Sequence, residues 1–189
     1  MDETLERRLR ALLDKDEIRE QLMLYCRGAD RRDAALISAV YHPDASVDHG
    51  LFRCRGDEAA AQVIAHAPLA GMHMVGNLSV DLEGDVAYSE SYNLVFSASA
   101  PDGRQFTYLR GSRYVDRWER RDGSWRIAFR VSVTELGRYD EVVETGPPAW
   151  PDVRGPRSES RATLFGVEAP DDPVYRVRDA AWRAERAVA

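Results

Sequence analysis

The sequence predicts an α+β fold in which N-terminal helices cover one side of a curved antiparallel sheet and enclose a pocket. Within the first 136 residues, helix-like spacings of apolar residues occur only before residue 68, and between residues 72 and 136 the apolar period changes to two. Turn-forming sequences divide that second region into four long runs. Sheets of such long strands usually curl, and helices packed on one side of a curled sheet leave a concave pocket.

Three helices are expected before residue 68. Over residues 4–25 apolar side chains recur every three or four positions, which is typical of an amphipathic helix, and Asp14 or Asp16 is expected to cap a second segment within it. A short helix should begin at Asp33 and end at Pro43, because the residue before a proline avoids helical angles. The segment GDEAAAQVIAHAP, with acidic residues in its first turn, fits a third helix.

The four long runs predict an antiparallel meander. The turn signals EGD, PDGR and RDGS separate strands that are expected at residues 72–82, 86–99, 105–120 and 124–136. Two shorter segments, at 45–49 and 52–55, are expected to add edge strands.

Length and composition narrow the class of protein. The chain has 189 residues, a formal charge of -6 and 44% hydrophobic residues, which describe one soluble domain. No run of about 18 uncharged apolar residues exists to span a membrane. The N-terminus carries charges of both signs where a secretory signal needs an apolar run, so a cytoplasmic location is expected. A pI near 5.3 lacks the electrostatic footprint of a nucleic-acid-binding protein.

A C-terminal extension is expected after the domain at residues 1–145. Residues 146–189 hold six of the nine prolines, followed by a helical pattern at 174–187. The extension also carries four aromatic residues, which are Trp150, Phe165, Tyr175 and Trp182. Because these are too many for a bare linker, we expect the extension to pack on the domain or on a neighbouring subunit.

The histidines are the first candidates for chemistry, because an unperturbed imidazole titrates near neutrality. His42 and His66 lie beside prolines at expected helix ends and are interpreted as structural. The spacings among the four histidines do not match helical zinc motifs, and Cys26 and Cys54 are too far apart for a CxxC site, so no metal is expected. His73 opens the first long strand on its more polar face, either as a general base or as a histidine hydrogen-bonded within the sheet.

Three further residues have two possible roles each. Asp30 follows the first helix, and it is either a carboxylate at the helix end or the partner of a catalytic group. Tyr25, five residues earlier, is a core aromatic residue or projects into the same cavity. Arg130 on the last strand is solvated, or it is a fixed cation for a leaving group or an oxyanion if its face is concave. The same polar faces of the neighbouring strands offer Ser91, Asn93, Tyr108, Ser112 and Tyr114.

Four strings within residues 10–138 resemble one family. They are DKDEIREQLMLYCRGADRRD, YHPDASVDHG, MHMVGN and GSRYVDRWERRDGSWRIAFR. Together they are similar to the SnoaL-like branch of the nuclear transport factor two-like superfamily, in particular to its lyases that include scytalone dehydratase, bile-acid dehydratase and hexachlorocyclohexane dehydrochlorinase. The resemblance implies a cystatin-like, cone-shaped barrel, a homotrimer and no cofactor.

The resemblance also implies site roles. In that group an Asp at the end of the first helix orients a His on the first long strand, and Asp30 and His73 fall on those positions. Tyr25 and Arg130 match a tyrosine and an arginine of the same lyases. Substrate contacts are expected from four further residues, His49, Asn93, Tyr108 and Tyr114. His49 has two open roles, since it either joins the acid–base chemistry or only holds an edge strand.

These residues together predict a cofactor-independent lyase. A His–Asp dyad would remove a proton and eliminate water, or another small group such as formaldehyde, from a hydroxylated aromatic or alicyclic compound in catabolism. Two alternatives use the same pocket: an isomerase or cyclase with the same base, and a non-catalytic ligand-binding member of the superfamily.

Overall fold

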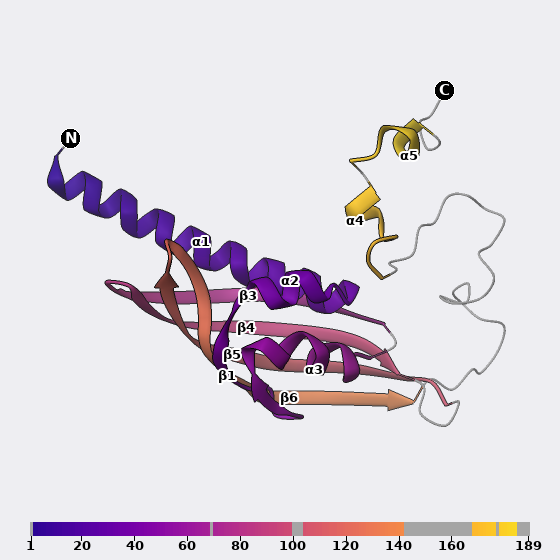
Figure 1. Cartoon of the computed structure of the whole chain (residues 1–189). Helices are drawn as coiled ribbons and strands as arrows, with labels where there is room; N and C mark the ends of the chain where they lie inside the picture. The colour runs from indigo at the N-terminus through magenta and orange to yellow at the C-terminus, as the bar shows by residue number, and fades with distance from the viewer. Residues whose placement is uncertain (1, 69, 100–103, 142–167, 177, 185–189) are drawn as a thin grey trace.

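The fold is an α+β domain in which helices cover one face of a six-stranded sheet (Figure 1). The computed structural model describes residues 2–68, 70–99, 104–141, 168–176 and 178–184. Within them the strand order is β2-β1-β6-β5-β4-β3. The sheet is curved and does not close, because β2 and β3 form its two edges. The predicted fold class is confirmed, with an open sheet in place of a closed barrel.

The first helix, α1 (Glu3–Arg31), is a single continuous helix. The predicted second start within it is wrong, because Asp14 is engaged elsewhere: its Oδ1 accepts hydrogen bonds from Arg120 Nη1 at 2.7 Å and Trp125 Nε1 at 3.0 Å. The apolar stripe is buried only in its C-terminal half, where Ile18, Leu22 and Tyr25 join the core. The leucines of the N-terminal half are exposed, including Leu12 at 64%.

Two short helices follow α1. The helix α2 (Ala34–Ala39) begins at the predicted cap, since the Asp33 carboxylate accepts hydrogen bonds from the N–H groups of the second and third helical residues. It packs closely on α1 at Gly28, where an added Cβ would lie 2.9 Å from Ile37 Cγ1. The predicted third helix is a 3₁₀ turn, η1 (Gly56–Glu58), followed by α3 (Ala59–Ala65).

The antiparallel meander is confirmed. Its strands are β3 (Ala70–Glu83), β4 (Val86–Ser99), β5 (Phe106–Arg121) and β6 (Ser124–Glu141), each paired with the next. The inner face of this sheet and the helices share the core, in which Trp118 and Trp125 are the largest fully buried side chains. Cys26 is also buried there as a free thiol, and Cys54 packs at its edge.

The segment around Pro43 differs from the prediction. It belongs to β1 (Tyr41–Asp48), which lies between β2 (Arg53–Arg55) and β6. Of the two short strands predicted to lie at an edge, only β2 does so. The strand β1 runs parallel to β6, and its register shifts between Tyr41 and Ser46. Pro43 lacks an N–H to donate to a neighbouring strand, and this irregularity accommodates it.

A bulge in β3 decides which of its side chains face inward. The β3–β4 register shifts between Val75 and Leu78, so that Leu78 and Val80 share the inner face with His73. The predicted alternation, which placed His73 with Ser79 and opposite Val80, is therefore wrong beyond Val75. Before the bulge it is correct, since Met72 and Met74 are about half exposed on the outer face.

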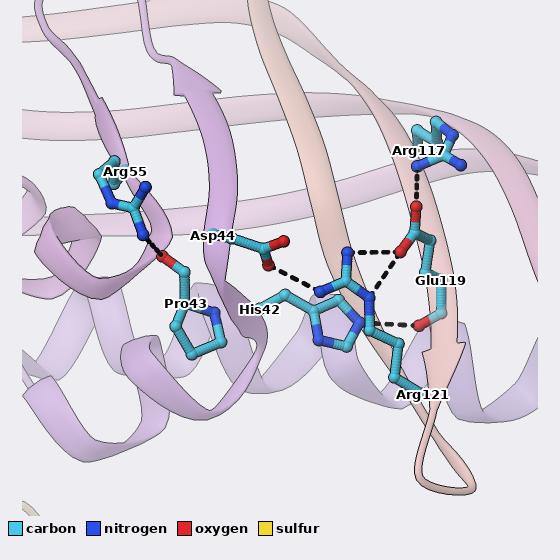
Figure 2. Close-up of polar contacts among 7 residues, drawn as sticks. All are labelled: His42, Pro43, Asp44, Arg55, Arg117, Glu119 and Arg121. Carbon is cyan, nitrogen blue, oxygen red and sulfur yellow. Dashed lines mark hydrogen bonds and ion pairs between the residues drawn. The ribbon is translucent and has the colours of Figure 1, made fainter.

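His42 is structural, as predicted. Its buried ring lies at the end of the sheet, where Nε2 is 3.0 Å from the Glu119 carbonyl oxygen (Figure 2). Around it Arg121 forms ion pairs with Asp44, at 2.7 Å, and with Glu119, which also pairs with Arg117. The contacts join β1 to β5 beside the turn between β5 and β6.

Position 56 requires glycine because the neighbouring backbone leaves no room for a side chain. A Cβ at this position would lie 2.0 Å from the His42 carbonyl oxygen, which is backbone and cannot rotate away. We expect Gly56→Ala to lower the free energy of unfolding by about 3 kcal/mol or more, measured by urea denaturation. Gly76→Ala is the matched control, because its Cβ would meet nothing closer than 3.8 Å. Equal stability of the two variants would contradict this account of Gly56.

Part of the C-terminal extension contacts the end of α1. The Ala169 N–H donates to the Arg31 carbonyl oxygen at 2.9 Å, and Arg32 forms an ion pair with Glu168 at 2.6 Å. Two short helices follow, α4 (Pro173–Arg176) and α5 (Ala180–Ala184). Trp150 and Phe165 lie outside the described residues, and the boundary at residue 145 stays a prediction.

Candidate active site

Asp30 and His73 form a dyad that joins the last turn of α1 to the start of β3. Asp30 Oδ1 lies 2.6 Å from His73 Nδ1, and Oδ2 accepts the backbone N–H of His73 at 3.0 Å. Both side chains are largely buried, with 14% and 12% exposed, and both line the same cavity. The carboxylate thus fixes both the backbone and the ring of His73.

The dyad leaves one ring nitrogen of His73 available. A carboxylate only accepts hydrogen bonds, so we assign the imidazole hydrogen to Nδ1, and Nε2 then carries a lone pair. An imidazolium formed at this ring would be paired at once with Asp30. This arrangement has the chemistry that a general base requires.

Tyr25 and His49 form a second pair in the same cavity. The Tyr25 hydroxyl lies 2.9 Å from His49 Nε2, and the His49 ring stacks on Phe52 with centroids 5.0 Å apart. Burial raises the pKa of Tyr25, although the nearby Arg130 opposes this, so the phenol is protonated at neutral pH. Burial, followed by the charges of Arg130 and Arg110, lowers the pKa of His49 to about 3, so this ring is neutral.

The depressed pKa of His49 predicts how stability depends on pH. The unfolded chain binds a proton at this residue below pH about 6.5, whereas the folded protein does not until pH about 3. Stability contributed by the neutral ring is therefore lost as pH falls through this window, by up to about 1.4 kcal/mol per pH unit. We expect urea denaturation between pH 6.5 and 4.5 to show a steeper loss for the wild type than for His49→Gln. Equal slopes would contradict the buried neutral ring.

Arg130 lies behind the cavity wall and not in the cavity. Its guanidinium is fully buried and forms two hydrogen bonds with Asp116, both at 2.7 Å. The cation is held between the rings of Tyr25 and Tyr114, with its Cζ 4.4 and 4.2 Å from their centroids. Burial alone would lower the pKa of Arg130, but attraction to Asp116 outweighs it and the pKa stays well above the ordinary value. Arg130 therefore contacts the Tyr25 ring, which lines the cavity, and is not itself a lining residue.

The four expected substrate contacts divide into two groups. His49 and Tyr108 line the cavity, whereas Asn93 and Tyr114 are buried and are not among its lining residues. Among the described residues, Asn93 Oδ1 and the Tyr114 hydroxyl have no hydrogen-bond partner. A buried polar atom in this state costs about 1–3 kcal/mol unless water or a ligand reaches it. Substrate contact by these two residues stays a prediction.

The cavity is large and open, with a volume of about 1740 Å³. His66, interpreted above as structural, also lies in its wall, where Nδ1 is 2.9 Å from the Gln62 carbonyl oxygen. The C-terminal extension contributes further lining residues, including Glu168 and Ala169. Much of the remaining wall is apolar or aromatic, which suits a hydrophobic ring.

Arg110 on β5 is a cavity residue that the sequence analysis missed. It lies on the same strand face as Tyr108, Ser112 and Tyr114, all of which the period-two pattern selected. Its Nε is buried and has no hydrogen-bond partner among the described residues. The period-two alternation also places Arg110 on this face. It was not selected as a candidate because an arginine in a charge-rich strand is ordinarily solvated.

Two further features are absent from the described part of the chain. No group of three or more His, Cys, Asp or Glu side chains is placed to hold a metal ion there. No helix of those residues has the length and apolar character needed to cross a membrane.

Comparison with known proteins identifies the family. Residues 10–131 match the SnoaL-like domain. The uncharacterized protein Rv2910c of Mycobacterium tuberculosis is 31% identical over an alignment of 127 positions, which covers 62% of this chain and 83% of the relative.

Solved structures share the fold at lower identity. A hexachlorocyclohexane dehydrochlorinase of type 2 has a TM-score of 0.66 at 18% identity, covering 75% of this chain and 99% of the other. A scytalone dehydratase-like protein of Novosphingobium aromaticivorans has a TM-score of 0.59 at 18% identity, covering 75% and 97%. A matched domain over most of the folded core and this common architecture lead to one conclusion: the chain belongs to the SnoaL-like domain family of the nuclear transport factor two-like superfamily.

Proposed function

We propose that the protein is a cofactor-independent lyase that eliminates water or another small group from a hydroxylated aromatic or alicyclic compound. The observation that carries this is the Asp30–His73 dyad, which leaves His73 Nε2 as a proton acceptor in a cavity lined largely by apolar groups. General-base catalysis of this kind contributes about 10²- to 10⁴-fold to the rate.

The reaction needs no reagent beyond the substrate. His73 Nε2 takes a proton from the carbon next to the one that bears the hydroxyl group. The electron pair of that C–H bond forms the new C=C bond while the C–O bond breaks. The departing oxygen takes a proton from the Tyr25 hydroxyl and leaves as water. Transfer of the proton on His73 back to Tyr25 through water restores the protein.

The surroundings of Tyr25 support its role as the acid. If His49 Nε2 carries the hydrogen of its neutral ring, it donates to the phenolic oxygen and the Tyr25 hydrogen is directed to the leaving group. Negative charge that develops on the phenol is then stabilised by the His49 donor and by Arg130, 4.4 Å from the ring centroid. Arg130 is thus a positioning residue and not a direct contact of the substrate.

Other leaving groups and reactions use the same base. If the group lost is formaldehyde, His73 removes the proton of a hydroxymethyl group, and the electron pair of the broken C–C bond remains on the product carbon, which is then protonated. An isomerase or cyclase would move the proton without losing mass, and a binding protein would give no product. We extend the proposal to a cytoplasmic protein of aromatic-compound catabolism. The resemblance implies a homotrimer, and sedimentation tests this oligomeric state.

The test is direct. Purified protein would be incubated with hydroxylated aromatic and alicyclic diols, without added metal or nucleotide, and the products analysed by mass spectrometry. Loss of 18 mass units indicates dehydration and loss of 30 indicates release of formaldehyde, as the masses of these molecules require. Conversion without a mass change would identify an isomerase or cyclase, and saturable binding without conversion would replace the enzyme with a binding protein.

A further inference from the structure

We propose that Arg110 binds a carboxylate of the substrate, so that the protein acts on an anionic compound. This assignment names part of the substrate and therefore rests on the proposed function. It depends on three observations: the place of Arg110 in the sheet, the pairing of every other charged side chain that lines the cavity, and the field of Arg110 at His49.

The sheet register puts Arg110 on the same face as the dyad. His73 is opposite Val95 in β4, and Val95 is opposite Arg110 in β5. Directly opposed residues project to the same side of a sheet, so Arg110 and His73 both project to the cavity, which both line. Two strand spacings separate their backbones by about 10 Å. A ring bound between them could present its reacting carbon to His73 and an anionic group to Arg110.

The acidic residues of the cavity are all engaged elsewhere. Asp30 is paired with His73, Glu168 with Arg32, and Asp140 with Arg138. Asp171 lies 3.5 Å from Arg176. Arg110 therefore has no carboxylate to neutralise it among the lining residues that the structure describes.

The other arginines of the cavity wall each have a partner. Arg32 and Arg138 have those given above, and Arg31 forms an ion pair with Asp172 at 2.9 Å. Arg110 differs, because its Nε is buried without a hydrogen bond. A guanidinium has five N–H donors in a plane, and a carboxylate accepts two of them at once. A bound carboxylate would therefore supply the hydrogen-bond partner that this partly desolvated guanidinium lacks.

The charge of Arg110 acts on another lining residue, His49. Its charge is one of the causes that lower the pKa of His49, after burial and Arg130. A bound carboxylate would offset this charge. Because Asp30 is committed to His73, the substrate itself is the natural source of that negative charge.

The test compares two probes of nearly equal shape, benzoate and benzamide, by isothermal titration calorimetry. We expect the wild type to bind benzoate more tightly, and Arg110→Met to weaken benzoate binding about 10- to 100-fold while leaving benzamide unchanged. Arg110→Lys keeps the charge and should retain part of the preference. Arg138→Met is the matched control, because Arg138 lines the cavity but is paired with Asp140.

Three outcomes would overturn the assignment. These are equal affinity for the two probes in the wild type, a preference that survives in Arg110→Met, and a preference that Arg138→Met removes equally. Thermal unfolding of each variant would show that the fold is retained. The same titration in His73→Gln separates this inference from the proposed function, since benzoate binding should survive there even if the protein proves to have no lyase activity.

Discussion

Replacing His73 by glutamine is expected to lower kcat for elimination by about 10²- to 10⁴-fold, with a much smaller change in KM. The reason is that glutamine keeps a polar group near Asp30 but has no nitrogen able to take a proton at neutral pH. The loss would appear in kcat because proton removal occurs only in the chemical step. The measurement is the steady-state rate of product formation by mass spectrometry.

Two variants make this result specific. Asp30→Asn is expected to cause a loss of the same order, because an amide can donate to Nδ1 and would favour the ring tautomer whose Nε2 carries a hydrogen. His66→Gln is the control, since His66 also lines the cavity but contacts the Gln62 carbonyl oxygen and no carboxylate. Full activity in His73→Gln, or an equal loss in His66→Gln, would remove the proposed base.

Replacing Arg130 by methionine is expected to lower the free energy of unfolding by about 3–5 kcal/mol, measured by urea denaturation. The substitution leaves Asp116 buried without its partner, at 2% exposed, and removes the cation from between Tyr25 and Tyr114. A charge left unpaired in the interior costs far more than the pair itself contributes.

Two comparisons isolate the origin of that loss. The double variant Arg130→Met with Asp116→Leu should be more stable than Arg130→Met alone, because no unpaired charge remains. Arg138→Met breaks an ion pair whose arginine is 75% exposed, and it should change the free energy of unfolding by less than about 1 kcal/mol. If Arg130→Met proved as harmless as Arg138→Met, the pair with Asp116 would not be buried as described.

The surroundings of Arg130 could not be predicted from the alternation of its strand. The alternation left two possibilities for it, a solvated side chain or, on a concave face, a cation for a leaving group or an oxyanion, whereas the structure shows a fully buried guanidinium. Asp116 was not considered, although a bulge in β6 brings the two opposite each other. Because a buried guanidinium must be neutralised by a neighbouring carboxylate, Arg130 pairs with Asp116 and is not a lining residue of the cavity, whereas Arg110 is.

Local rules of chain geometry were enough to predict the four-strand meander, the cap at Asp33 and the placement of His73 on an inward face, because alternation and capping depend on neighbours within a few residues. The pairing of Asp30 with His73 was predicted from the resemblance of short sequence segments to a known family, and not from periodicity. Contacts over long sequence separations decided the rest: the parallel pairing of β1 with β6, the bulge after Val75 and the pairing of each charge in the cavity. Those features arise when segments that are distant in the sequence pack against one another, so they cannot be predicted from the neighbours of each residue in the chain.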